Sequence, residues 1–449
     1  MMERTILWTK SKNNIIFMKK IFIFILTLIF TSTNLFADSF SNALIKAYNK
    51  NPKLNAEREN ISISEENINI SKSDFLPTVT LSGTKSKEDT SKLTNQSGGN
   101  AAITDVDPET QSLLIEQTIF QGYGGMADLE KNKIGLDLAK VKLLKVEQEI
   151  IYEAAQAYTG LVLANKKYKI NQSNVSLLER QVETDQARLE KGQISLVDLA
   201  QSESSLAGAY AKFIEAKNEV VTGQLVYENV IGSINDISEL SDKLNINIYL
   251  PENLSEASKI SQKNSPELII AKLELQQSEK DVTIARADLA PSVSLSFQST
   301  KTEDLSSTYD ERDKEVLKAT VSWPIFSGGK NRATLKKNRN LSNQKKLLLE
   351  DAVNSNNTSV ASAWSNYQSS KSMLDSVRSQ VRAAEIANEG ITIEYESGLG
   401  RSTLDVIQSN TLLLDSKVSL ANSERNYLLS QLKLLQSIGS LTAQYLQIN

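Results

Sequence analysis

Two short segments place a serine three residues before an aspartate. They are Ser195-Leu-Val-Asp198 and Ser402-Thr-Leu-Asp405. This spacing predicts a capping box, in which the serine caps the first turn of a helix and the acid serves the helix end and its dipole. We therefore expect a helix to begin at each motif. The capping role does not exclude a second role for either carboxylate.

The composition excludes most enzyme chemistry. The chain has 449 residues and contains neither cysteine nor histidine. That absence removes thiol nucleophiles, disulfides, the usual zinc ligands and the commonest general base. Any catalyst here would depend on carboxylates, lysine, tyrosine or serine alone. We therefore predict that the protein is not an enzyme and uses no cofactor and no metal.

The N-terminus has the pattern of a secretory signal peptide. Met18-Lys-Lys is followed by an apolar run over residues 21–30 and by a cleavage site near Ala37. The run is too short for a membrane anchor, and the residues before Met18 indicate an over-long start. Removing residues 1–37 takes away five basic residues and one acidic residue, which changes the net charge from −4 to −8. We therefore expect no nucleic-acid partner.

The mature chain is an internal duplication. Asn51-Pro-Lys-Leu54 matches Ser265-Pro-Glu-Leu268 at an offset of 214 residues, and Ile119-Phe-Gln-Gly122 matches Ile325-Phe-Ser-Gly328 at an offset of 206 residues. Self-similarity at a fixed separation indicates repeated structural units. We predict a first structural repeat over residues 38–250 and a second over residues 251–449.

Each repeat is predicted to contain a helix, a β-hairpin, a very long helix and a return helix. Asn51 and Ser265 each precede a proline, which is typical of a helix start. A period of two predicts strands on both sides of the polar segments 85–111 and 301–315, which we expect to be loops. The segments that follow Gly122 and Gly328 contain no proline as far as Lys191 and Ser397, and they predict helices about 100 Å long at 1.5 Å per residue.

The return helices repeat every seven residues, as in a coiled coil. Large apolar residues form one row in each: Leu199, Leu206, Phe213, Val220 and Tyr227, and Val406, Leu413, Leu420, Tyr427 and Leu434. Small residues form a second row: Ser202, Ala209, Ala216 and Gly223, and Ser409, Ser416, Ser423, Ser430 and Ser437. The small row fits either a wall with water behind it or a close-packed helical hairpin.

The predicted strands have one apolar face and one polar face, which fits a barrel wall between lipid and water. Each chain supplies four strands, whereas a closed barrel needs about eight. The strands therefore predict that several subunits share one barrel.

The duplication, the Phe-x-Gly turns at Phe120 and Phe326, and the segment from Tyr395 to Val406 resemble the TolC family of outer-membrane efflux proteins. The resemblance covers residues 38–440. It implies an α+β membrane protein: a homotrimer whose long coiled-coil helices form an α-barrel and whose strands form a shared 12-stranded β-barrel. It also implies an outer-membrane channel that extends into the periplasm, contacts outer-membrane lipid and docks onto an inner-membrane pump or ABC transporter with its periplasmic adaptor protein. The cargo would be drugs or polypeptides.

The resemblance also implies a gate at the periplasmic helix tips. In this family an aspartate matching Asp198 is held by a tyrosine and an arginine matching Tyr395 and Arg401, and acids of the last helix ring the constriction. Asp405 matches the first ring acid. Gln408 stands in place of the second, which implies a weaker cation preference. The segment from Gly398 to Asp405 is one residue longer than the family spacing, and this affects the pairing of Arg401.

Four aromatic residues lie where the predicted strands meet the long helices: Phe120, Tyr123, Trp323 and Phe326. We expect them to form an aromatic girdle at the periplasmic edge of the membrane, with ordinary packing at this corner as the alternative.

A second class of function is a soluble periplasmic coiled-coil adaptor or structural protein. It explains the signal peptide and the heptads, but it leaves the duplicated hairpins without a purpose. If the protein is a channel, the sequence does not separate drug efflux from protein secretion.

Overall fold

A computed structural model describes residues 40–446, apart from residues 93, 95, 101–104, 235–236, 238–239, 241–247 and 307–308. The predicted signal peptide lies outside the described residues. The predicted first repeat contains α2 (Phe40–Lys50), α3 (Pro52–Ser73), β1 (Thr78–Lys85), β2 (Glu109–Gln121), α4 (Gly124–Glu190) and α5 (Leu196–Val230). The predicted second repeat contains α6 (Leu254–Asn264), α7 (Pro266–Ala287), β3 (Ser292–Glu303), β4 (Glu311–Ser322), α8 (Lys330–Glu396) and α9 (Thr403–Ser437).

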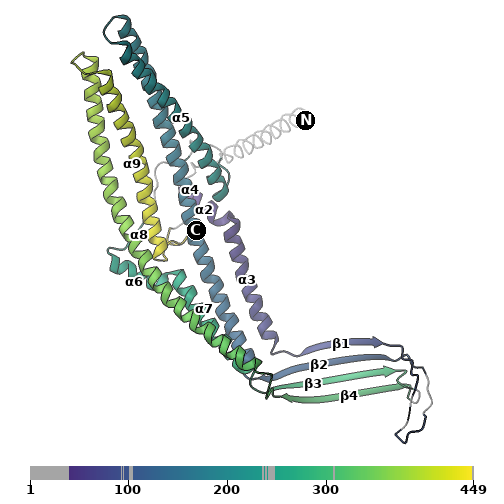
Figure 1. Cartoon of the computed structure of the whole chain (residues 1–449). Helices are drawn as coiled ribbons and strands as arrows, with labels where there is room; N and C mark the ends of the chain where they lie inside the picture. The colour runs from purple at the N-terminus through teal and green to yellow at the C-terminus, as the bar shows by residue number, and fades with distance from the viewer. Residues whose placement is uncertain are drawn as a thin grey trace, which may run out of the picture.

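The long helices lie side by side, and the sheet projects from one end of them (Figure 1). The helices α4 and α8 have 67 residues each and are therefore about 100 Å long. Contacts of α4 with α5 and α9, and of α8 with α9, give a layer in the order α5, α4, α9, α8. Over the described part of the chain, no helix is both long enough and apolar enough to cross a membrane.

Most of the buried apolar residues lie at the middle of the helical layer. Phe40 of α2 contacts Tyr158 of α4 edge to face at 5.2 Å, and Tyr227 of α5 lies beside Tyr158. Leu432 and Leu435 of α9 complete the same cluster, and all five side chains are at most 2% exposed. Toward the helix tips there is a smaller cluster around Val175, Leu178 and Ala209. The helices are therefore packed most tightly at this central cluster, which we call the waist of the molecule.

The rows of small residues face the neighbouring helix. Ser202, Ala209 and Ala216 of α5 are at most 4% exposed, and Ser416 of α9 is fully buried. A Cβ atom on Gly223 would lie 3.4 Å from the Leu161 side chain of α4. Small side chains thus let α5 approach α4 closely, which favours the close-packed hairpin over a water-lined wall for this row.

The sheet is antiparallel, in the order β1, β2, β3, β4. One cross-strand row joins Val79, Ile115, Phe297 and Leu317, so the apolar residues of all four strands share one face. A register shift between Thr118 and Phe120 leaves Ile119 unpaired and places Phe120 opposite Val293 in its stead. This bulge interrupts the simple alternation expected in β2.

The strands extend further than the alternation predicted. The predicted loop over residues 301–315 contains the end of β3 and the start of β4, and β2 begins inside the predicted loop over residues 85–111. These strand ends carry polar residues on both faces, so they have no period-two hydrophobic signal. Lys301 of β3 forms an ion pair with Glu303 of the same strand at 2.8 Å and with Glu311 of β4 at 2.9 Å.

The Phe-x-Gly turn of the first repeat requires its glycine. Gly122 has φ +60, and a Cβ atom there would lie 2.7 Å from Ala290 Cβ and 2.8 Å from the Ala287 carbonyl oxygen. The turn between β2 and α4 therefore packs directly against the end of α7.

Candidate functional site

The two helical hairpins end side by side at the end of the molecule far from the sheet (Figure 1). Each return helix begins with the predicted capping box. The Ser195 N–H donates to Asp198 Oδ2 at 2.9 Å, and the Asp198 N–H donates to Ser195 Oγ at 3.3 Å. Ser402 and Asp405 make the same pair of bonds at 2.9 and 3.2 Å.

These bonds also set the charge of the two aspartates. The backbone N–H and then the hydroxyl of Ser195 hold the pKa of Asp198 below its ordinary value, and Ser402 lowers the pKa of Asp405 in the same way. Hydrogen bonds to a carboxylate favour its charged form. Both aspartates therefore carry a negative charge at neutral pH.

Tyr395 connects the two hairpins near their tips. Its hydroxyl, at the end of α8, donates to Asp185 Oδ1 of α4 at 2.7 Å and lies 3.1 Å from Thr403 Oγ1 of α9. The tyrosine is 6% exposed, and its pKa is raised, chiefly by burial. The Arg188 guanidinium of α4 lies 4.3 Å from the centre of the same ring, in a cation–π contact. The tyrosine thus binds the first hairpin through its hydroxyl and through its ring.

Asp185 is a fully buried carboxylate with donors from three helices. It accepts bonds from Gln181 Nε2 of its own helix at 3.1 Å, from Ser202 Oγ of α5 at 2.6 Å, and from Tyr395. A buried charge is costly unless hydrogen bonds surround it, and these three donors supply them. Separating the hairpins would remove the tyrosine from this arrangement.

The structure thus brings Tyr395 to a different acid from the one expected from the family resemblance. Among the described residues, the side-chain bonds of Asp198 stay within its own capping box. Arg401, in the turn between α8 and α9, donates its Nε to Glu394 Oε2 of α8 at 2.6 Å, within the same hairpin. Gln408 is exposed on α9, less than one helical turn beyond Asp405. The pairing of Asp198 with Tyr395 and Arg401 is therefore not present within one chain.

Asp185 and Arg188 were not predicted from the sequence. Both are ordinary charged residues in a long helix rich in charge. The one available signal was Ser202, because a serine in a buried row of small residues needs a partner for its hydroxyl, and Asp185 supplies that partner.

The four junction aromatics lie where the sheet meets the helices. Phe120 and Tyr123 contact edge to face at 5.4 Å, and Trp323 Nε1 donates to the Leu289 carbonyl at 3.1 Å. Trp323 is nevertheless 61% exposed and Phe326 is 86% exposed. Packing at the corner therefore explains the contact between Phe120 and Tyr123, but it leaves large apolar surfaces of Trp323 and Phe326 exposed.

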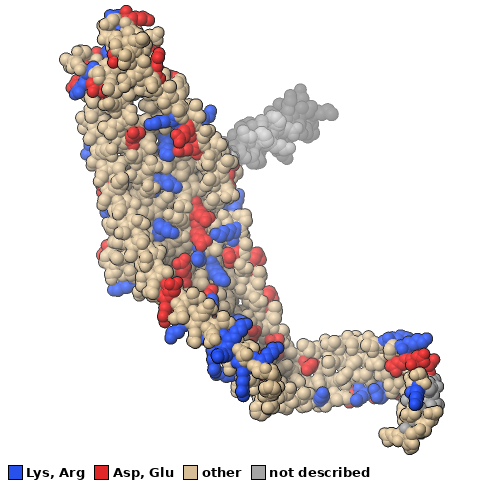
Figure 2. Space-filling view, viewed as in Figure 1, with Lys and Arg blue, Asp and Glu red and all other residues tan. Residues whose placement is uncertain are grey.

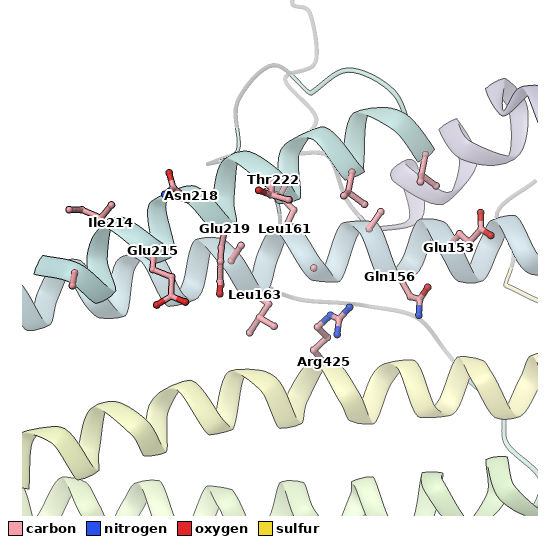
Figure 3. Close-up of a pocket in the computed structure, with 17 residues that line it drawn as sticks. Glu153, Gln156, Leu161, Leu163, Ile214, Glu215, Asn218, Glu219, Thr222 and Arg425 are labelled. Carbon is pink, nitrogen blue, oxygen red and sulfur yellow. The ribbon is translucent and has the colours of Figure 1, made fainter. Parts of the chain in front are cut away.

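A groove of about 970 Å³ lies along α4 and α5 at the level of the waist. Figure 3 shows Arg425 reaching into it from α9, between the carboxylates of α4 and α5. Arg425 Nε has no hydrogen-bond partner among the described residues, and burial lowers the pKa of this guanidinium. Among all the residues that the structure describes, no group of three or more acidic side chains is placed to hold a metal ion.

Comparison with known proteins gives a consistent result. The family described as "Outer membrane efflux protein" matches residues 43–232 and 258–440. The outer membrane efflux protein BepC of Brucella suis biovar 1 is 24% identical over 412 residues, which cover 91% of this chain and 87% of BepC. Outer membrane protein TolC of Escherichia coli K12 is 22% identical over 421 residues, which cover 91% of this chain and 83% of TolC.

A solved structure has the same fold. The outer membrane protein VceC of Vibrio cholerae superposes with a TM-score of 0.76 at 17% identity, covering 89% of this chain and 96% of VceC. The expected architecture of long helices and a four-stranded sheet is therefore confirmed. The chain belongs to the outer membrane efflux protein family and is an outer-membrane export channel that extends into the periplasm, not an enzyme.

Proposed function

We propose that the channel is a homotrimer in which twelve strands close one barrel and the long helices close one tunnel. The sheet supports this because β1 and β4 are its edges and four strands are too few to close a barrel. Pairing β4 of one copy with β1 of the next satisfies both edges. The number three follows from the family resemblance.

The edges of the helical layer support the same assembly. α5 and α8 are the outer helices of the layer, and both expose large apolar side chains. On α5 these are Tyr210, Ile214, Val221 and Leu225, and on α8 they are Leu347, Met373, Ile386 and Ile393. Ile214 also lines the groove in Figure 3. A head-to-tail ring covers both edges with the same contact.

We infer that the apolar face of the sheet contacts outer-membrane lipid. Val79, Leu81 and Leu317 on this face are 63%, 79% and 72% exposed, and lipid is the solvent that suits them. Phe120, Tyr123, Trp323 and Phe326 then form the girdle at the periplasmic edge of the bilayer.

We infer that the gate is formed by the tips of the two hairpins. In the closed state Tyr395 of each subunit is bonded to Asp185, and Asp198 and Asp405 supply negative charge around the mouth. Arg401 stabilises its turn through Glu394, and Gln408 leaves the second ring position neutral. Opening separates α8 and α9 from α4 and α5, which breaks the tyrosine bond.

The channel itself supplies no energy, so its transport depends on partners. An inner-membrane pump or ABC transporter, joined through a periplasmic adaptor protein, docks near the tips and delivers drugs or polypeptides. The match to BepC, an efflux protein by name, supports this assignment.

The test is a conductance measurement on the mature protein, residues 38–449, purified from outer membranes and inserted into planar bilayers. We expect stable pores of small conductance whose cation preference falls in Asp405→Ala. The matched control is Asp415→Ala, which removes the same charge further along α9. A protein that stays soluble and forms no pores would overturn the proposal in favour of a periplasmic adaptor.

A further inference from the structure

The polar face of the sheet is identified by its own hydrogen bonds. Thr110 Oγ1 donates to Thr302 Oγ1 at 3.2 Å, and the Ser112 and Thr300 hydroxyls lie 3.3 Å apart. The apolar row of Val79, Ile115, Phe297 and Leu317 lies on the opposite face because it has the opposite parity in every strand. If the apolar face meets lipid, the hydroxyl face lines the aqueous passage.

Three cations stand on this hydroxyl face along β4. They are Arg312, Lys314 and Lys318, whose partners on β3 are Thr302, Thr300 and Ser296. Figure 2 shows Lys and Arg along this edge of the sheet, which is β4 in Figure 1. Their positions from 312 to 318 span about 20 Å at 3.4 Å per residue. Among the residues that the structure describes, none of the three has a carboxylate within ion-pair distance.

The strands on either side of β4 do not supply counter-charges. The β3 residues of the hydroxyl face carry hydroxyl or amide groups. In the proposed ring the other neighbour is β1 of the next copy, whose residues on this face are Thr78, Thr80, Ser82 and Thr84. This conclusion does not depend on the register between copies, because all four are neutral. The strands carry one acid on this face, Glu116 of β2, which lies two strands and about 10 Å from Lys318.

On the opposite, apolar face of the sheet, which faces outward in the proposed barrel, the cations have acidic partners. Lys85 bridges Glu109 at 3.4 Å, and Lys301 bridges both Glu303 and Glu311. Cations of the outward face are thus neutralised by acids on the same strand or on the adjacent strand. On the inward face, three cations and one acid leave a net charge of +2 per chain.

We propose that Arg312, Lys314 and Lys318 form an anion-binding column in the distal part of the passage, which selects cargo bearing several negative charges. This rests on the proposed trimeric barrel, in which the column occurs three times. Rings of lysine and arginine attract anions in pores, and a narrow passage with low-dielectric walls focuses the field. Several weak sites in series allow an anion to enter and to leave.

The test is block of the channel current by inorganic tripolyphosphate, added to one side of the bilayer and then to the other, in 0.1 M KCl. We expect block of the native channel from the side of the sheet, and a blocking concentration at least about tenfold higher in R312Q/K314Q/K318Q. The matched control is K85Q/K301Q, which removes cations from the outward face and leaves the block unchanged. Block should also weaken in 1 M KCl, where the screening length falls to about 3 Å.

The outcomes separate the two proposals. Assembly of each variant is checked by its mobility as a trimer on a semi-native gel. Trimeric pores with equal block in native protein and in the luminal triple variant would refute the column while leaving the channel intact. Equal loss of block in K85Q/K301Q would refute its assignment to the inward face. Failure of the native protein to form pores would refute the barrel, and with it the column.

Discussion

Removing one oxygen atom from Tyr395 should open the gate. Tyr395→Phe keeps the ring over Arg188 but removes the hydroxyl that donates to Asp185. A hydrogen bond to a charged group contributes about 1.5–3 kcal/mol, and this one exists only while the hairpins are together. Three copies at the lower value give about 4.5 kcal/mol. Since 1.4 kcal/mol corresponds to a factor of ten, the ratio of closed to open channels should fall by about 10³.

The assay is single-channel recording of open probability in planar bilayers, with Tyr210→Phe as the matched control. Tyr210 of α5 also donates to a carboxylate, Glu179 of α4, but that bond lies within one hairpin. Asp185→Asn should have a smaller effect than Tyr395→Phe, because its amide oxygen still accepts the bond. An open probability that is unchanged in Tyr395→Phe, or raised equally in Tyr210→Phe, would refute the reasoning.

Three further outcomes are expected. Phe297→Arg on the apolar face should cost about 2–4 kcal/mol and lower the yield of trimer, whereas Ser296→Arg on the hydroxyl face should assemble normally, as measured on semi-native gels. The pKa of Asp198 is lowered in the folded state. Its charged form therefore stabilises α5 above the ordinary pKa of about 3.9, and this stabilisation is lost as the pH falls through the lowered pKa. Hydrogen exchange of the backbone amides of residues 196–199 should accelerate only in that acidic range. Leu432→Ala should cost about 2–5 kcal/mol and lower the temperature of thermal dissociation, whereas Leu412→Ala, at a site 52% exposed, should change stability by less than about 0.5 kcal/mol.

The long elements of the fold were predictable from the sequence because their signals are local. The absence of proline after Gly122 and Gly328 predicted helices reaching Lys191 and Ser397, and the structure ends them one residue earlier in each case. The serine and aspartate pairs predicted both return helices, since a capping box uses residues only three positions apart. Asn51 also caps its helix as expected, accepting the Lys53 N–H at 2.9 Å.

The contacts of the tip were not predictable in the same way. Asp185 and Tyr395 are 210 residues apart, and their meeting depends on how far α4 extends relative to α8. A shift of one helical turn would move the carboxylate by about 5.4 Å and bring a different side chain to the tyrosine. Nothing in the local pattern around either residue specifies that offset. The ends of β3 and β4 escaped prediction for another reason, because strands that are polar on both faces have no alternation to detect.

The concentration of buried residues at the waist makes each hairpin a lever. From Leu161 in the waist cluster to the end of α4 at Glu190 the helix extends about 45 Å. A tilt of roughly 10° about the waist would therefore move the tip by about 8 Å, enough to break contacts that reach only 3–4 Å. Near the tip the movement is opposed by the hydrogen bond from Tyr395 to Asp185 and by the cation–π contact of Arg188 with the Tyr395 ring, which both join α8 to α4. A modest lateral force at the tip of a hairpin is therefore enough to break the few contacts between the tips, and it leaves the apolar cluster at the waist intact.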